Sequence, residues 1–260
     1  GSQVTVALLT SSLKPKERKA LIDEISNGTV DIVIGTHALL THDVVFSNIA
    51  VAITDEQHRF GVEQRATLRN KGGQDNEVPH TLVMTATPIP RTMSLTIFGD
   101  LDVSTINKLP PGRTPVKTKQ VLPDDASKVY GYAKELVQQG RQCYVVVPLV
   151  ETTDTGLKSA ESHAKEIQQT YFKQFKVGVV HGRLSSEERA LTMQQFRNGE
   201  IDVLVATTVI EVGVDVSNAS MMIIEHAERF GLAQLHQLRG RIGRGGKAGT
   251  CLLLYATPLT

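Results

Sequence analysis

The sequence has almost no excess charge of either sign and only two cysteines. Its 28 basic and 27 acidic side chains nearly cancel, so the composition carries no signature of a nucleic-acid-binding protein. A polyanion would have to be bound by a local group of basic residues. Cys143 and Cys251 each lie in an apolar, strand-like run with no histidine at ligand spacing. We therefore expect buried thiols and no zinc site.

A long apolar run is also missing. The sequence contains no signal peptide and no stretch of about 18 apolar residues, which predicts a soluble, cytoplasmic protein that does not contact a membrane. Gly1 and Ser2 are interpreted as a cloning remnant, with natural sequence from Gln3, so the chain is expected to be part of a longer protein.

The phosphate-binding loop Gly-x-x-x-x-Gly-Lys-Ser/Thr is absent as well. The pair Gly246-Lys247 is followed by Ala248, and Arg241 stands where the first glycine of the motif would be. The sequence therefore contains no recognisable cradle of backbone amides for the phosphates of a nucleotide.

What the sequence does contain is an internal repeat. Residues 13–36, LKPKERKALIDEISNGTVDIVIGT, match residues 184–207, LSSEERALTMQQFRNGEIDVLVAT, at an offset of 171. The strings DEQHRFG, from Asp55, and EHAERFG, from Glu225, match at an offset of 170. A register kept from Leu13 to Gln64 indicates two copies of one supersecondary unit.

Each copy has the pattern of an α/β protein. Helical periodicity over residues 15–28 begins at Pro15 and ends at Gly28. The expected strands are continuous apolar runs, which are typical of parallel strands covered on both faces. These runs are residues 31–36, 49–56, 81–87, 142–149, 177–182, 202–208, 220–226 and 249–256.

The repeat predicts two α/β lobes whose strands are joined by right-handed crossovers. The lobes are residues 3–109 and residues 116–260. Between them, residues 110–115 form a proline- and glycine-containing linker, which is a poor helix or central strand.

An acidic pair, Asp55 and Glu56, follows one of the apolar runs of the first copy. Ligands of open α/β sheets bind at the carboxyl ends of strands. Asp55 could therefore hold Mg²⁺ while Glu56 polarises a water molecule against a phosphate. From these two residues alone, a helix-capping role for Asp55 is the alternative.

The second copy offers arginines instead. The string QLRGRIGRGG places Arg239, Arg241 and Arg244 close together between glycines. A guanidinium group makes paired bonds to phosphate, and one supplied from an opposing lobe can stabilise a transferring phosphoryl group. A solvated basic loop or a general DNA-backbone patch is the alternative.

Several strings carry a resemblance to a known family. DEQH, TATP, ATTVIEVGVDV and QLRGRIGRG, in this order on repeated lobes, resemble motifs II, III, V and VI of superfamily 2 helicases. The longer strings DEQHRFGVEQR, MTATPIPRTM, LPPGRTPV and ERFGLAQLHQLRGRIGRG resemble RecG-type branch-migration helicases over essentially residues 3–260. The transcription-repair coupling factor shares TATPIPRT and much of motif VI but usually reads Asp-Glu-Glu-Gln in place of DEQH, and ranks second.

The resemblance implies two RecA-like lobes. The first runs from motif Ib to motif III and is truncated before its phosphate-binding loop, and the second runs from motif IV to motif VI. ATP and Mg²⁺ are the implied cofactors, branched or forked DNA the partner, and a monomer the default state. The implied parent is an ATP-driven double-stranded-DNA translocase that remodels stalled forks and junctions in recombination and repair. Without the phosphate-binding loop and the N-terminal wedge domain of such a parent, the isolated chain is expected to lack ATPase activity.

The resemblance also implies roles for single residues. Asp55 binds Mg²⁺, Glu56 activates the attacking water, and Arg241 and Arg244 reach the phosphates, with Arg244 as the arginine finger. Further nucleotide-binding positions are Gln57, His58, Gly213, Asp215 and Gln237. Positions that bind DNA or couple the two sites are Gly35, Thr36, His37, Thr85, Thr87, His181, Gly182, Arg183 and Thr207.

Two other classes of function stay open. A nucleic-acid-binding module without ATP hydrolysis would tolerate Glu56→Gln in the whole protein with no loss of ATP turnover. A protein-interaction scaffold would show no salt-dependent DNA binding, whereas a surface that binds phosphates weakens steeply with salt.

Overall fold

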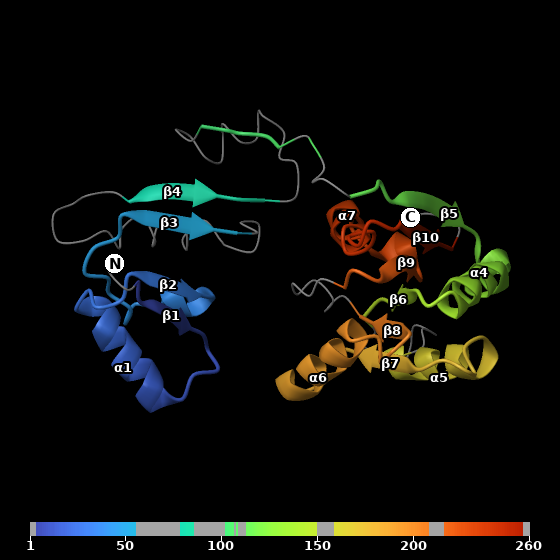
Figure 1. The fold of residues 1–260 in the computed structure, drawn as a ribbon, viewed down its shortest axis with the longest axis horizontal. Coiled ribbons are helices and arrows are strands. Elements are labelled where there is room, and N and C mark those ends of the chain that lie inside the picture. The colour runs from blue at the N-terminus through green and yellow to red at the C-terminus, as the bar shows by residue number, and fades with distance from the viewer. Residues whose placement is uncertain are drawn as a thin grey trace. The chain divides into compact units, whose positions relative to one another are not determined.

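The computed structural model describes residues 4–55, 79–85, 102–106, 108, 113–149, 159–207 and 216–256. The chain forms two compact units, Gly1–Met93 and Ser94–Thr260, called unit 1 and unit 2 below. In both, helices or 3₁₀ turns separate most of the successive strands that the structure describes (Figure 1). The linker expected at residues 110–115 falls within the range of unit 2, and its role as a joint stays a prediction.

Unit 2 is built on a six-stranded parallel sheet with the order β5–β10–β9–β6–β8–β7. The strands are β5 (Lys117–Val121), β6 (Gln142–Val146), β7 (Val177–Val180), β8 (Val203–Ala206), β9 (Ala219–Ile224) and β10 (Thr250–Leu254). The three central strands, β9, β6 and β8, are buried at every residue. Their continuous apolar sequences predicted this, since both faces of a parallel sheet are covered.

Helices pack on both faces of this sheet. One core cluster contains side chains of α4 (Ala126–Gln138), α5 (Ala160–Thr170) and one face of the sheet. A second contains side chains of α6 (Ser186–Arg197), α7 (Leu232–Arg239) and the opposite face. Short 3₁₀ turns, η3 (Pro123–Asp125) and η6 (Ala227–Arg229), precede α4 and α7. None of the described helices is long and apolar enough to cross a membrane.

Unit 1 is smaller in its described part. It contains β1 (Val6–Leu9), α1 (Pro15–Ser26), β2 (Ile32–Gly35), the 3₁₀ turn η1 (His37–Leu40), β3 (Val51–Thr54) and β4 (His80–Val83). Parallel pairing joins β1 to β2 and β3 to β4. Leu9, Ile25 and Val44 form its small buried core.

The internal repeat is confirmed element by element. The bounds of β7, α6 and β8 are those of β1, α1 and β2 shifted by 171 residues. The ladder that pairs Val51 with His80 recurs, shifted by 170, where Met221 pairs with Thr250. The repeat therefore begins at β1 and ends at β4, farther in both directions than the sequence match indicated.

Even single hydrogen bonds recur in the two copies. Asp31 accepts the backbone N–H of Thr5 at 2.8 Å, and Asp202 accepts that of Lys176 at 2.8 Å. The carboxylate thus links the starts of two neighbouring strands, β1 and β2 in unit 1 and β7 and β8 in unit 2. The helix between those strands is followed in each unit by a glycine with positive φ, Gly28 or Gly199.

One central part of unit 2 has no counterpart in the described residues of unit 1. In unit 2, β6 separates β8 from β9, and α4 and α5 cover the adjacent face. No described strand stands between β2 and β3, and four of their side chains are 49 to 63% exposed: Ile32, Ile34, Val51 and Ile53. Their counterparts are fully buried: Val203, Val205, Met221 and Ile223.

The sequence predicted parallel strands that are covered on both faces. For β2 and β3 of unit 1 this prediction is wrong, because their side chains on one face are exposed. The apolar sequence of β2 and β3 fits a fully covered sheet, but the elements that cover the equivalent face in unit 2 are not supplied by the described part of unit 1.

Candidate functional site

The carboxyl ends of four neighbouring strands in unit 2 bring the candidate residues to one edge. The strands β9, β6, β8 and β7 are consecutive in the sheet, and the residues that follow them are Glu225, Val147, Thr207 and His181. In open parallel sheets this edge is where ligands bind. Three of these four positions are polar, although the strands themselves are apolar.

Thr207 is the buried polar residue at the end of β8. It is 4% exposed, and its backbone N–H donates to the carbonyl of Val180 at 3.2 Å. Its hydroxyl has no hydrogen-bond partner among the described residues. A buried hydroxyl without a partner is uncommon and suits a position that a ligand completes.

His181, by contrast, is engaged within the protein. Its Nε2 atom lies 2.8 Å from a carboxylate oxygen of Glu161, and its Nδ1 atom accepts the backbone N–H of Arg183 at 3.3 Å. Gly182 and Arg183 are exposed in the turn that precedes α6. His181 therefore orients this turn, and the exposed residues beside it are the ones available to a ligand.

The arginine-rich segment follows α7. Gln237 lies in the helix, and Arg241 and Arg244 come just after it; all three are half-buried. The Nε atom of Arg244 donates to the carbonyl of Gly240 at 3.0 Å. This bond uses the inner nitrogen of the guanidinium group and sets the direction of its outer end.

The sequence did not single out Arg113, which also binds Gly240. Its Nη2 atom donates to the same carbonyl at 2.9 Å, and nearby Thr114 donates to the carbonyl of Lys247 at 3.3 Å. The only sequence signal was an arginine in a proline- and glycine-rich stretch. The segment that begins at Arg113 is thus fixed to the arginine-bearing loop.

In unit 1 the structure brings two predicted residues together. Asp55 follows β3 and Thr85 comes two residues after β4, and the pairing of these strands continues with a bond of 2.8 Å from the Met84 N–H to the Thr54 carbonyl. Both Asp55 and Thr85 are exposed. An accessible carboxylate at a strand end is a hard oxygen donor of the kind that Mg²⁺ prefers.

The predicted DNA contacts of unit 1 lie at the end of β2. Thr36 and His37 are exposed where η1 begins, and the Thr36 carbonyl accepts the Leu39 N–H at 3.0 Å. A Cβ atom on Gly35 would lie 2.4 Å from the carbonyl oxygen of Leu9, so this position requires glycine. Thr36 is the repeat counterpart of Thr207.

The other predicted site residues lie outside the described residues. They are Glu56, Gln57, His58, Thr87, Gly213 and Asp215. Within the described ranges, no group of three or more His, Cys, Asp or Glu side chains is arranged to hold a metal ion.

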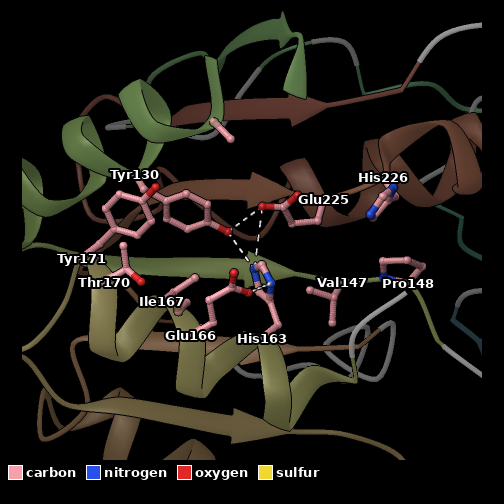
Figure 2. A pocket seen from close by; sticks show the side chains of 11 residues that line it. Tyr130, Val147, Pro148, His163, Glu166, Ile167, Thr170, Tyr171, Glu225 and His226 are labelled. Carbon is pink, nitrogen blue, oxygen red and sulfur yellow. Dashed lines mark hydrogen bonds and ion pairs between the residues drawn. The ribbon is translucent and has the colours of Figure 1, made fainter. Parts of the chain in front are cut away.

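A pocket of about 310 Å³ lies at the same edge of unit 2, between α4 and α5 (Figure 2). Its lining contains polar residues, among them Tyr130, His163, Glu166 and Glu225, and apolar residues such as Val147. Sequence reasoning missed this pocket, because its walls come from elements far apart in the chain.

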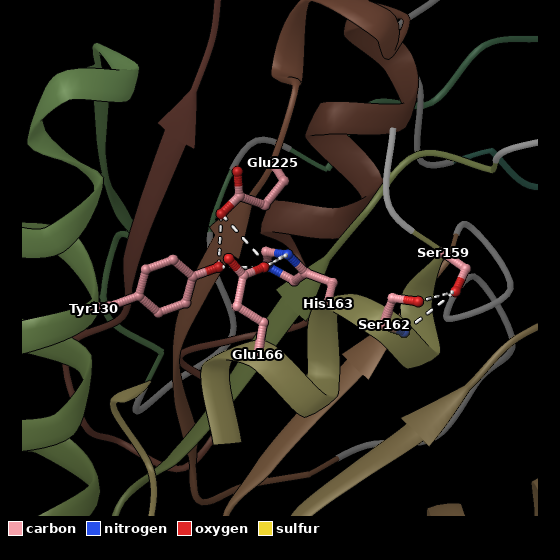
Figure 3. A network of polar contacts seen from close by, with 6 residues as sticks. All are labelled: Tyr130, Ser159, Ser162, His163, Glu166 and Glu225. Atoms are coloured by element: carbon pink, nitrogen blue, oxygen red, sulfur yellow. Dashed lines mark hydrogen bonds and ion pairs between the residues drawn. The ribbon is translucent and has the colours of Figure 1, made fainter. Parts of the chain in front are cut away.

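A hydrogen-bonded network occupies one wall of the pocket (Figure 3). The Tyr130 hydroxyl donates to Glu225 Oε1 at 2.6 Å and lies 2.9 Å from Nε2 of His163. Because a hydroxyl has a single proton, His163 must donate its Nε2–H to the tyrosine oxygen. Burial, and then the Glu225 carboxylate, raise the pKa of Tyr130 well above its usual range, so the phenol stays protonated.

Comparisons with known proteins cover nearly all of the chain. Residues 2–95 match the DEAD/DEAH box helicase family, and residues 128–246 match the helicase conserved C-terminal domain. The ATP-dependent DNA helicase RecG of Thermotoga maritima is 49% identical over 252 residues, covering 96% of this chain and 32% of the relative. RecG of Staphylococcus aureus (strain Mu50) is 48% identical over 262 residues, covering 100% of this chain and 37% of the relative.

Solved structures agree. A structure of RecG bound to a three-way DNA junction is 45% identical, with a TM-score of 0.70 over 98% of this chain and 32% of that chain. The helicase Lhr of Mycobacterium smegmatis, bound to single-stranded DNA and AMP-PNP, is 19% identical, with a TM-score of 0.69 over 97% of this chain and 35% of that chain. The second likeness shows the fold alone. The chain spans about a third of the length of these relatives.

Proposed function

The chain belongs to the RecG-type family of superfamily 2 helicases, and from this membership we propose that it is part of the motor of an ATP-dependent DNA helicase. The substrate of the whole protein is branched or forked DNA, which it remodels in recombination and repair. The observation that carries this proposal is the 45% identity, over 98% of the chain, to RecG bound to a three-way DNA junction. We further propose that the protein works in the cytoplasm and as a monomer.

The nucleotide-binding roles are divided between the repeats. Asp55 holds Mg²⁺, which neutralises phosphate charge when bound, and Glu56 polarises the attacking water. Arg241 and Arg244 stabilise the charge of the transferring phosphoryl group, with Arg244 as the finger. Contacts to the nucleotide are assigned to Gln57, His58, Gly213, Asp215 and Gln237. The exposed position of Asp55 at a strand end and the half-buried arginines support this division.

The DNA-binding roles fall on the strand-end turns. The hydroxyl of Thr207, which has no hydrogen-bond partner within the described ranges, suits a contact to the sugar–phosphate backbone. Its counterpart Thr36 and the turn at Gly182 and Arg183 are exposed and suit such contacts as well. Such contacts position DNA without reading its sequence. Gly35, His37 and His181 shape these turns, and Thr85 with Thr87 couples the nucleotide site to them.

The isolated chain is proposed to hydrolyse little or no ATP. The four exposed apolar side chains of β2 and β3 mark the place that β6, α4 and α5 fill in unit 2. We assign that place to a strand and helices from another part of the whole protein, which also bring the phosphate-binding loop. Without that loop, Asp55 and Arg244 have no phosphate held in place to act on.

The test compares ATP hydrolysis by this chain with hydrolysis by the full-length protein, each with and without forked DNA. We expect turnover only in the full-length protein, stimulated by the fork and abolished by Glu56→Gln with the fold unchanged. Turnover that survives Glu56→Gln would favour a binding module, and the absence of salt-dependent DNA binding would favour a scaffold. Stimulation by a stalled RNA polymerase rather than by forks would favour a transcription-repair coupling translocase.

A further inference from the structure

Glu225 occupies, in unit 2, the position that Asp55 occupies in unit 1. Each follows the strand whose ladder is shared by the two repeats, with Val51 paired to His80 and Met221 paired to Thr250. The pocket beside Glu225 therefore stands where a metal–phosphate site would stand in the other repeat. Since Glu166 and Glu225 both line this pocket, a phosphate group there would be repelled.

The surroundings of Glu225 differ from those of a metal ligand. Its side chain is 16% exposed and accepts the Tyr130 hydroxyl at 2.6 Å, while Nε2 of His163 lies 3.7 Å from the same oxygen. Tyr130 is 3% exposed and stacks on Tyr171, with ring centroids 4.9 Å apart. Figure 3 shows the three side chains converging from α4, α5 and the end of β9. Glu225 thus has a phenol and an imidazole as its partners, whereas Mg²⁺ is the partner proposed for Asp55.

The chain just after Glu225 is unusual. His226 has φ 51° and ψ 49°, and it is the only residue other than glycine with positive φ among those the structure describes. A left-handed conformation is unfavourable for a side-chain-bearing residue and persists where the surroundings fix it. The residues after His226 are also fixed, because the side chain of Glu228 accepts the backbone N–H of Ala256 at 3.1 Å.

This turn leads directly into α7 and the arginine-bearing loop. η6 (Ala227–Arg229) follows His226, and α7 begins at Leu232. The direction in which Gln237, Arg241 and Arg244 project therefore depends on where the turn is held.

We propose that Tyr130, His163 and Glu225 are positioning residues. They fix the strained turn at His226 and thereby orient the two arginines that follow α7, Arg241 and Arg244. The acidic strand-end position would then have different uses in the two repeats, metal binding at Asp55 and the fixing of a turn at Glu225. The inference rests on the proposed function for its catalytic part, whereas the fixing of the turn is a property of unit 2 alone.

The first measurement uses the full-length protein with saturating forked DNA. Tyr130→Phe keeps the stacked ring and removes the hydroxyl, so we expect kcat for ATP hydrolysis to fall about tenfold while KM for ATP stays within about twofold. Tyr132→Phe on the same helix is the matched control, because that side chain is 42% exposed, and it should leave both constants unchanged. Glu225→Gln, which keeps an acceptor for the hydroxyl, should retain most of the rate, whereas Glu225→Ala should lose as much as Tyr130→Phe.

The second measurement is amide hydrogen exchange on the present chain. Tyr130→Phe should speed exchange over residues 225–240 and leave α6 unaffected. Unchanged exchange together with unchanged kcat would overturn the proposal, as would equal losses from Tyr132→Phe or an equal loss from Glu225→Gln and Glu225→Ala. If exchange rises but the full-length wild-type protein does not hydrolyse ATP, the fixing of the turn is supported and the proposed function fails.

Discussion

Gly245 lies immediately after Arg244, where the loop passes very close to another backbone segment. A Cβ atom added at this position would lie 2.2 Å from the carbonyl oxygen of Ser217 and 2.9 Å from its carbonyl carbon. Both distances are far shorter than a van der Waals contact, and both atoms belong to the backbone. The perturbation we choose is therefore Gly245→Ala, which adds one methyl group and nothing else.

The expected cost follows from the rigidity of what the methyl group meets. Adding a methylene-sized group to a packed site costs typically ~1–3 kcal/mol, and a backbone carbonyl cannot rotate away as a side chain would. We expect a loss of ~2–3 kcal/mol in the stability of unit 2. For a domain of 150–250 residues this corresponds to a fall in melting temperature of roughly 4–12 °C.

Gly131→Ala is the matched control. Gly131 lies inside α4, and apart from its chain neighbours and the nearby backbone of the helix itself, no atom of the described residues lies within 4 Å of the position that an added methyl group would occupy. The same substitution there removes only the entropic cost of a helical glycine, so stability should rise by ~0.5–1 kcal/mol. The two variants therefore change melting temperature in opposite directions.

The assay is thermal unfolding followed by circular dichroism, with hydrogen exchange to assign the transition to unit 2. If Gly245→Ala melts with the wild-type protein, the Ser217 segment moves aside at little cost and the reasoning from a rigid close approach is refuted. If Gly131→Ala also lowers the melting temperature, the effect is not specific to the crowded site.

Three further predictions concern other parts of the chain. Thr207→Val should leave stability within about 1 kcal/mol of wild type, because the hydroxyl has no partner among the described residues, yet weaken DNA binding about fivefold in filter-binding assays. The hydrogen bond from Arg18 lowers the pKa of Asp43 well below its usual range. In urea titrations, the stabilisation that Asp43→Asn removes near neutral pH should therefore begin to decline as the pH falls below about 4, the ordinary pKa of an unfolded aspartate, and should be lost only at the lower pH at which the folded carboxylate is protonated. Burial raises the pKa of both thiols, that of Cys251 to about 12, so Cys143 and Cys251 should react with a thiol reagent only after unfolding.

Much of the fold could be predicted from the sequence, because the apolar runs of the repeat indicate its strands and the prolines and glycines indicate where its helices begin and end. The helix at Pro15, its stop near Gly28 and the strands of both copies are confirmed. The strands end one to four residues before the apolar runs do, and β4 and β9 begin one residue earlier than expected. β5 was not expected, since four of its five residues, Lys117–Val121, are polar and the strand forms the edge of the sheet.

The candidate site was only partly accessible to such reasoning. Asp55, Thr207 and the arginines could be proposed because they follow strands or sit in a recognisable string. The bonds from Tyr130 to Glu225 and from Arg113 to Gly240 join residues 95 and 127 positions apart. No local pattern encodes such pairs, because they arise from the packing of elements that only the folded chain brings together.

The exposed apolar side chains of β2 and β3, with no described strand between these two strands, have a consequence for the order of folding. Unit 2 carries its own central strand, β6, within one contiguous stretch of chain. In the whole protein, the sheet of unit 1 would instead be completed by a segment that is more distant in sequence, and contacts of long sequence separation form slowly. We therefore expect unit 2 to become rigid first. Unit 2, which carries Arg241 and Arg244, would then be folded before unit 1, which carries the proposed metal ligand Asp55.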